Sequence, residues 1–126
     1  MFTFNKHKRH IQGKIEVTQK KIWDLEFLKE KLKAMREGFR QEYDRLQEQV
    51  DAATLRLEVE NKKEDADKTI VENLTKFKER IDPDIGQLKT QMAAVESQIE
   101  GDNGVNQSID GLRTVLGMLV EYKKTI

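Results

Sequence analysis

FRQEYDRLQEQVDAATLRL, residues 39–57, carries the most regular apolar pattern in the chain. Its apolar side chains recur at alternating spacings of four and three residues, which is the heptad pattern of a coiled-coil seam. They are Phe39, Tyr43, Leu46, Val50, Ala53 and Leu57. Because a helix with one narrow apolar stripe must bury that stripe against another helix, the stretch predicts an α-helix with a helical partner.

The stripe continues toward the N-terminus at spacings of three and four through Met35, Leu32, Leu28 and Leu25 to Ile22. This pattern predicts one helix from about residue 14 to about residue 60. At 1.5 Å per residue such a helix is about 70 Å long. Successive spacings of three around Leu25 and Leu28 break the heptad, so we expect an irregular supercoil there.

Charged side chains follow the stripe in two rows. The basic row lies next to it and consists of Lys29, Lys33, Arg36 and Arg40. The acidic row on the next face consists of Glu26, Glu30, Glu37, Asp44, Glu48 and Asp51. A basic edge beside a seam either selects the partner helix or holds phosphates, and we favour the first role.

Trp23, the one tryptophan, and Phe27 lie beside the stripe, four residues apart. We expect them to anchor the third helix or a second chain, with a hot spot for a different protein as the alternative. The predicted partner-binding residues are therefore Trp23, Phe27, Leu32, Phe39, Tyr43, Leu46, Lys29, Lys33, Arg36 and Arg40.

A polar stretch at residues 58–68 interrupts the stripe and predicts a turn near residues 61–64, with Asp65 or Asp67 capping the next helix. Beyond it a second apolar stripe runs from Ala66 to Ile99. Pro83 lies inside this stripe, yet the stripe keeps its phase across the proline. We therefore expect a kink or a one-turn break there, not a reversal of the chain.

GDNGVNQS, residues 101–108, combines two glycines, two asparagines and an aspartate and predicts a loop. Ser108 is then the expected cap of a last helix. A β-strand is the alternative for residues 114–122, because valine and tyrosine favour strands.

The first 13 residues form a basic N-terminal arm in this interpretation. Residues 1–40 carry a net charge of +6, and residues 41–126 carry −6. Lys6, Lys8, Arg9 and Lys14 are the candidate contacts to an anionic partner, and Phe2 and Phe4 add apolar side chains. Protein, nucleic acid and membrane are all open as targets, and we favour protein.

The composition gives little sign of catalysis. The chain has no cysteine and only two histidines, and two imidazoles lack the further ligands that zinc requires. No nucleotide-binding or hydrolase motif is present, so we expect no enzyme activity, cofactor or metal. No apolar run approaches the ~18 residues of a membrane span. We expect a cytoplasmic protein, with a virion component possible.

The sequence thus predicts an all-α fold: an elongated, coiled-coil-like helical hairpin with a short third helix, assembling into an oligomeric bundle. Its parts are the arm (1–13), the hairpin (14–100) and a loop with the C-terminal helix (101–126). The expected function is structural or scaffolding, through contacts between helices. The alternative is a nucleic-acid-binding accessory protein that uses the arm. Coiled-coil periodicity occurs in cytoskeletal, viral and secretion proteins alike, so it indicates no family.

Overall fold

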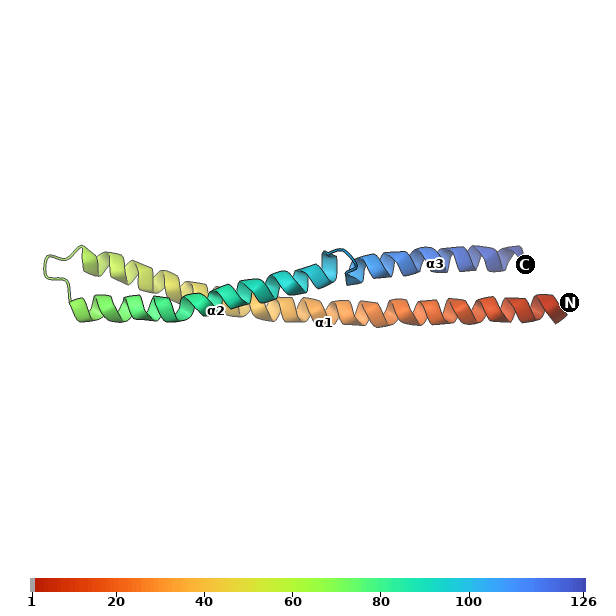
Figure 1. Cartoon of the computed structure of the whole chain (residues 1–126), viewed down its shortest axis with the longest axis horizontal. Coiled ribbons are helices and arrows are strands. Elements are labelled where there is room, and N and C mark those ends of the chain that lie inside the picture. The colour runs from red at the N-terminus through yellow and green to blue at the C-terminus, as the bar shows by residue number, and fades with distance from the viewer. Residues whose placement is uncertain (1) are drawn as a thin grey trace. The chain divides into compact units, whose positions relative to one another are not determined.

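The computed structural model describes the backbone of residues 2–126 and the side chains of residues 5–126. Three helices account for its secondary structure, α1 (Phe2–Asn61), α2 (Lys68–Glu100) and α3 (Val105–Thr125) (Figure 1). No strand occurs among the described residues, and residues 114–122 lie within α3. The all-α prediction is therefore confirmed, and the strand alternative is wrong.

Helix α1 begins earlier than the sequence pattern indicated. We expected a start near residue 14, but the helix extends back to Phe2. Ile11 explains part of the difference: it lies four residues before Ile15, and both side chains are buried. The apolar stripe thus gains one more turn, and Gly13 does not interrupt it. Whether residues 1–13 act as a separate arm stays a prediction, and the side chains of Phe2 and Phe4 lie outside the described residues.

The helices form two compact units, and α1 contributes to both. Unit 1 comprises Met1–Ala34 and Val95–Ile126. Unit 2 comprises Met35–Ala94.

Unit 2 is an antiparallel pair made by the C-terminal part of α1 and most of α2 (Figure 1). Its core contains Leu46 and Val50 of α1 and Ile81 and Ile85 of α2. Tyr43, Phe77 and Leu88 are partly buried around this cluster. The heptad positions of residues 39–57 are therefore buried by the chain's own second helix.

The turn between α1 and α2 spans residues 62–67 and is held by two carboxylates. Asp67 caps α2, because its Oδ1 accepts hydrogen bonds from the backbone N–H groups of Thr69 (2.9 Å) and Ile70 (3.4 Å). Glu60 is buried at the end of α1. Its Oε1 accepts from the N–H of Asp67 at 2.9 Å, and its Oε2 pairs with Lys63 Nζ at 3.0 Å.

Pro83 lies inside α2, which is a single helix from Lys68 to Glu100. The chain does not reverse there, and the one-turn break that we considered does not occur. Ile81 and Ile85, on either side of the proline, are buried in the same cluster, whereas Pro83 itself is exposed. The proline ring therefore points to solvent, where it leaves the packing of α2 on α1 intact.

Unit 1 places α3 and the last turns of α2 along the N-terminal part of α1 (Figure 1). Its buried apolar side chains are Ile11, Ile15, Ile22, Leu32, Val95, Ile99, Val105 and Ile109. Ile99 is fully buried. Contacts from early α1 residues reach late α3 residues, so this pair is also antiparallel.

The turn between α2 and α3 is shorter than predicted. It occupies residues 101–104, and α3 begins at Val105 with Gly104 as its N-cap. Ser108 is therefore not the cap: its backbone N–H donates to Gly104 O at 3.0 Å, inside the first turn of α3. Val105 is buried, so its packing adds this extra turn to the helix. Asn103 adopts a positive φ of 60° in this short break between the two helices.

Candidate interaction surfaces

One side of the α1–α3 contact in unit 1 is closed by polar side chains. Arg113 Nη2 donates to Glu26 Oε1 at 2.6 Å, and Lys123 Nζ donates to Gln12 Oε1 at 2.6 Å. Gln12 and Glu26 are 14 residues apart, about four helical turns, so they lie on the same side of α1. Both bonds join α3 to α1 along this side.

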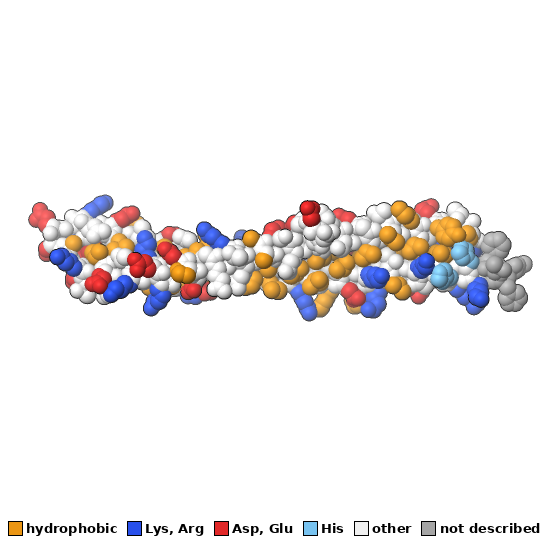
Figure 2. Space-filling view, viewed as in Figure 1, with side chains coloured by type: hydrophobic (Ala, Val, Ile, Leu, Met, Phe, Trp, Pro, Cys, Tyr) orange, Lys and Arg blue, Asp and Glu red, His pale blue; other side chains and the backbone are white. Residues whose placement is uncertain are grey.

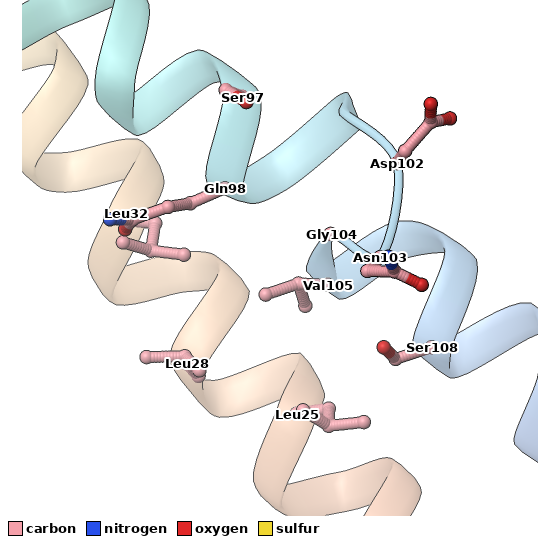
Figure 3. Close-up of a pocket in the computed structure, with 10 residues that line it drawn as sticks. All are labelled: Leu25, Leu28, Leu32, Ser97, Gln98, Asp102, Asn103, Gly104, Val105 and Ser108. Carbon is pink, nitrogen blue, oxygen red and sulfur yellow. The ribbon is translucent and has the colours of Figure 1, made fainter.

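The other side of the same contact is apolar and hollowed. Leu28 follows Glu26 by two residues, which places it about 200° further around α1. A depression there is lined by Leu25, Leu28 and Leu32 of α1 and by Val105 of α3, with residues 102–104 and Ser108 at its edge. In Figure 3 Val105 points from the start of α3 toward the leucines of α1. Each of these residues belongs to unit 1.

A second depression continues along this side of α1. Its lining includes Gly13, Lys14, Val17 and Lys21 of α1 and Leu119 of α3. Val17 and Leu28 are 11 residues apart, about three helical turns, so both depressions open on the same side.

Helix α3 adds three large exposed side chains to this side. Val115, Met118 and Tyr122 recur at spacings of three and four, and their exposed fractions are 45%, 65% and 46%. Ser108 lies two turns before Val115 on the same face of α3, and it lines the first depression. At the end of this row the Tyr122 hydroxyl is 2.8 Å from His7 Nε2.

We call this side the apolar face of unit 1 and define it by Val17, Leu25, Leu28, Val115, Met118, Leu119 and Tyr122. Figure 2 shows hydrophobic side chains gathered along unit 1, with lysine or arginine side chains beside them. Its α1 edge carries Arg9, Lys14 and Lys21, which are exposed and line the second depression. In the described part of the chain these three side chains take part in no ion pair.

Unit 2 has an exposed surface of opposite charge on α1. Asp44, Glu48, Asp51, Leu55 and Val59 recur at spacings of four and three, and all are exposed. We call these five residues the acidic stripe. The exposed fractions of Leu55 and Val59 are 62% and 61%, although both are apolar.

The acidic stripe lies on the side of α1 away from α2. Leu46 and Val50, which contact α2, fall about half a turn around the helix from it. Asp51 accepts a hydrogen bond from Gln47, and no ion pair is found for the three carboxylates among the described residues.

Trp23 and Phe27 do not pack against the third helix, which corrects one of our two expectations for them. Their exposed fractions are 70% and 63%, and Lys31 Nζ lies 4.8 Å from the centre of the Phe27 ring. The contact line with α3 runs instead through Ile15, Thr18 and Ile22, which are buried. Both rings project from the far side of α1, so a partner-binding role for them stays a prediction.

Most of the predicted seam residues are buried or half-buried against other helices of the same chain. Leu32 is buried in unit 1 and Leu46 in unit 2, while Phe39 and Tyr43 are half-buried. Lys89 Nζ lies 5.8 Å from the Tyr43 ring centre. These positions are covered by the chain's own helices, so in this state they offer little surface to a second chain.

The predicted basic residues fall into two groups. On the basic edge, Lys33 pairs with Glu30 at 3.6 Å and Arg40 with Glu37 at 3.3 Å, whereas Lys29 is half-buried and Arg36 is partnered. In the predicted arm, Lys6, Lys8, Arg9 and Lys14 are all exposed on the first turns of α1. Only Arg9 and Lys14 of these border the apolar face of unit 1.

Sequence reasoning missed Met118, Tyr122 and Glu60. Val115, Met118 and Tyr122 follow helical spacing, so the signal for their row was present in the sequence. It was overlooked because the stronger stripe of Ile109, Leu112, Leu116 and Leu119 runs beside it. Glu60 had no such signal, because its bond to Asp67 depends on the path of the turn.

Ion pairs within single helices shift the pKa of one exposed pair in unit 2. A hydrogen bond from Arg45 lowers the pKa of Glu42, and the same bond raises the pKa of Arg45. The pKa of Glu60 is lowered chiefly by the Asp67 N–H and also by Lys63. The shifts of Glu42 and Arg45 come from a pair that links neighbouring turns of α1, whereas the shift of Glu60 comes mainly from a hydrogen bond across the turn between α1 and α2.

Among the residues that the structure describes, no group of three or more His, Asp or Glu side chains is placed to hold a metal ion. No described helix combines the length and apolar character needed to cross a membrane. In comparisons with protein-family models, curated proteins and solved structures, nothing matches this chain.

Proposed function

We propose that the protein is a structural or scaffolding module that works by contacts between helices. The observation that supports this proposal is the apolar face of unit 1. It exposes Val115, Met118 and Tyr122 on α3 beside two depressions that are lined in part by leucine and valine side chains, while the opposite side of the same helix pair is closed by polar bonds. A contiguous apolar surface on one side of a helix pair marks an interaction site.

The shape of this face fits an amphipathic helix. Two antiparallel helices leave a groove along each side, and a third or fourth helix fills such a groove in a bundle. Methionine and tyrosine suit this role, because methionine adapts its shape and tyrosine combines apolar area with a polar end. In this proposal a coiled-coil-like bundle forms only when the groove is filled by another chain, and the protein has no catalytic role.

Site-specific photo-cross-linking in cells tests the proposal. A photoreactive phenylalanine at position 118 should give covalent adducts with protein, because Met118 is the most exposed of the three α3 side chains on the apolar face. The matched control is position 124, an exposed α3 residue paired with Glu121 on the polar side. Adducts at neither position, or equal yields at both, would contradict the proposal.

The second candidate function is nucleic-acid binding. The pair of Lys14 and Lys21 favours it, because these exposed side chains lie on one side of α1. Seven residues separate them, which is about 10 Å at 1.5 Å per residue. If phosphates are their target, affinity for DNA or RNA should fall on the order of tenfold between 50 and 200 mM salt, since about two counterions are released. Electrophoretic mobility shifts at these salt concentrations test this candidate.

A further inference from the structure

Resting on the proposed function, we propose that the occupant of the apolar face of unit 1 is the acidic stripe of unit 2 from a second copy of the same chain. Both surfaces are exposed, both combine apolar with charged side chains, and their charges are opposite. Every copy carries one surface of each kind, so each copy has both halves of the contact.

Charge complementarity is the first argument. Arg9, Lys14 and Lys21 border the apolar face without an ion pair among the described residues, and the same holds for Asp44, Glu48 and Asp51. Some other exposed charges of α1 do pair within the helix, as Lys20 does with Asp24 at 3.3 Å. The two surfaces thus hold charge of opposite sign that the single chain leaves unpaired.

The spacing of these charges is the second argument. Lys14 and Lys21 are seven residues apart, and so are Asp44 and Asp51. Seven residues are about 10 Å along a helix, so two parallel α1 helices can oppose both pairs at once. Glu48 then lies between the two lysines.

The same alignment also matches the apolar side chains. Opposing Lys14 with Asp44 offsets the second chain by 30 residues, and this offset brings Leu55 opposite Leu25. Val59 then falls opposite Lys29, next to Leu28, the second leucine of the first depression. An antiparallel pairing of the same charges would instead place Leu55 opposite His10. In the parallel register, therefore, the lysines oppose the aspartates and Leu25 opposes Leu55.

This contact uses two different surfaces, so it is heterologous and propagates from copy to copy. An offset of 30 residues corresponds to an axial stagger of about 45 Å along α1. We therefore expect a concentration-dependent series of assemblies, not a closed pair with one self-complementary patch.

A charge-swap experiment on the full-length protein tests the proposal. One chain carries Lys14→Glu with Lys21→Glu, so that its two surfaces are both acidic. The other carries Asp44→Lys with Asp51→Lys, so that both of its surfaces are basic. Each variant alone should lose self-association by about tenfold or more in sedimentation velocity, since two favourable ion pairs become two repulsions.

Mixing the two variants should restore association, because each then offers the surface that the other lacks. The matched control is Lys8→Glu with Lys124→Glu, which changes the charge of unit 1 equally. Lys8 lies one turn before Gln12 on the polar side, and Lys124 pairs with Glu121. This control should associate like the native protein.

Carbodiimide coupling of a mixture of ¹⁴N and ¹⁵N chains identifies the contact directly. Expected products are amide bonds between copies that join Lys14 or Lys21 to Asp44, Glu48 or Asp51. Links between copies at other residues, or no loss of association in the single variants, would overturn the inference. Adducts at position 118 with a different protein would overturn it as well, while leaving the scaffolding function intact. Salt-sensitive binding of DNA, lost in the lysine variant without any change in association, would favour nucleic acid as the occupant.

Discussion

Units 1 and 2 are both antiparallel helix pairs, but they differ in which apolar side chains they bury and which they expose. In unit 2 the heptad positions of α1 meet α2 in one narrow core around Leu46 and Ile81, and the outer side of α1 is acidic. In unit 1 a comparable core is flanked by a second row of exposed apolar residues on α3. Burial of the seam and formation of an interaction surface are therefore separable properties of the same fold.

The two units also differ in the sign of their unpaired charge. Among the described residues, Lys14 and Lys21 beside the apolar face take part in no ion pair, and neither do the carboxylates of the acidic stripe in unit 2. Both units contain local pairs as well, such as Lys20 with Asp24 and Lys76 with Glu72, which contribute little to stability. Unit 1 therefore combines exposed apolar area with unpaired positive charge, as expected of a surface that binds an acidic helix.

The largest expected effect comes from the core of unit 2. Leu46→Ala should lower its free energy of unfolding by about 2–5 kcal/mol, because it removes a buried side chain and leaves a cavity. Leu55→Ala is the matched control: the same change at an exposed site should alter stability by less than about 0.5 kcal/mol. Urea denaturation followed by circular dichroism measures both.

Amide hydrogen exchange shows which part of the protein loses stability in these variants. The loss of protection in Leu46→Ala should be greatest in residues 35–94, because the cavity lies in unit 2. If Leu55→Ala were as destabilising as Leu46→Ala, then Leu55 would have to be buried, and the acidic stripe would not be a free surface.

The second effect concerns the turn of unit 1. A Cβ on Gly104 would lie 2.8 Å from the carbonyl oxygen of Gly101 and 2.9 Å from that of Gln98. Both contacts are with backbone atoms, which move aside less easily than a side chain. Gly104→Ala should therefore lower the free energy of unfolding by about 1–3 kcal/mol. Gly117→Ala in α3 meets no atom within 4 Å and should stabilise the helix by about 0.5–1 kcal/mol. Thermal melts of the two variants should move in opposite directions.

The sequence predicted the parts of the fold that depend on periodicity. Leu46 and Val50 were expected on a buried seam because heptad spacing places them there, and the phase of the stripe across Pro83 excluded a reversal. The start of α1 was missed because Ile11 stands alone before Ile15, and only its burial against α3 shows that it extends the stripe.

The candidate surfaces were harder to predict, for a physical reason. Helical spacing shows which residues share a face, but not which of two adjacent apolar rows the partner helix covers. Met118 and Leu119 are neighbours of similar apolar character, yet one is exposed and the other half-buried. Trp23 was expected near α3 for the same reason, although the structure leaves it exposed on the far side.

The smallest expected effect is the pH dependence contributed by the turn of unit 2. Hydrogen bonds from the Asp67 N–H and from Lys63 lower the pKa of Glu60 in the folded state. Between this lowered pKa and the ordinary glutamate value of about 4.3, the unfolded chain binds more protons than the folded one. The stabilisation is therefore present above the ordinary value and is lost as the pH falls through the lowered pKa.

Glu60→Gln removes this titration while retaining an oxygen that can accept from Asp67. The variant should be less stable than the native protein at pH 7, and the difference should shrink as the pH falls below the ordinary glutamate pKa toward the lowered pKa of Glu60. Glu58→Gln, at an exposed site two residues earlier, is the control and should follow the native curve. Melting temperatures between pH 3 and pH 7 measure the effect. A constant difference between Glu60→Gln and the native protein across this range would mean that the charge of Glu60 does not hold the turn. In that case the capping of α2 by Asp67 alone would account for the reversal between the two helices of unit 2.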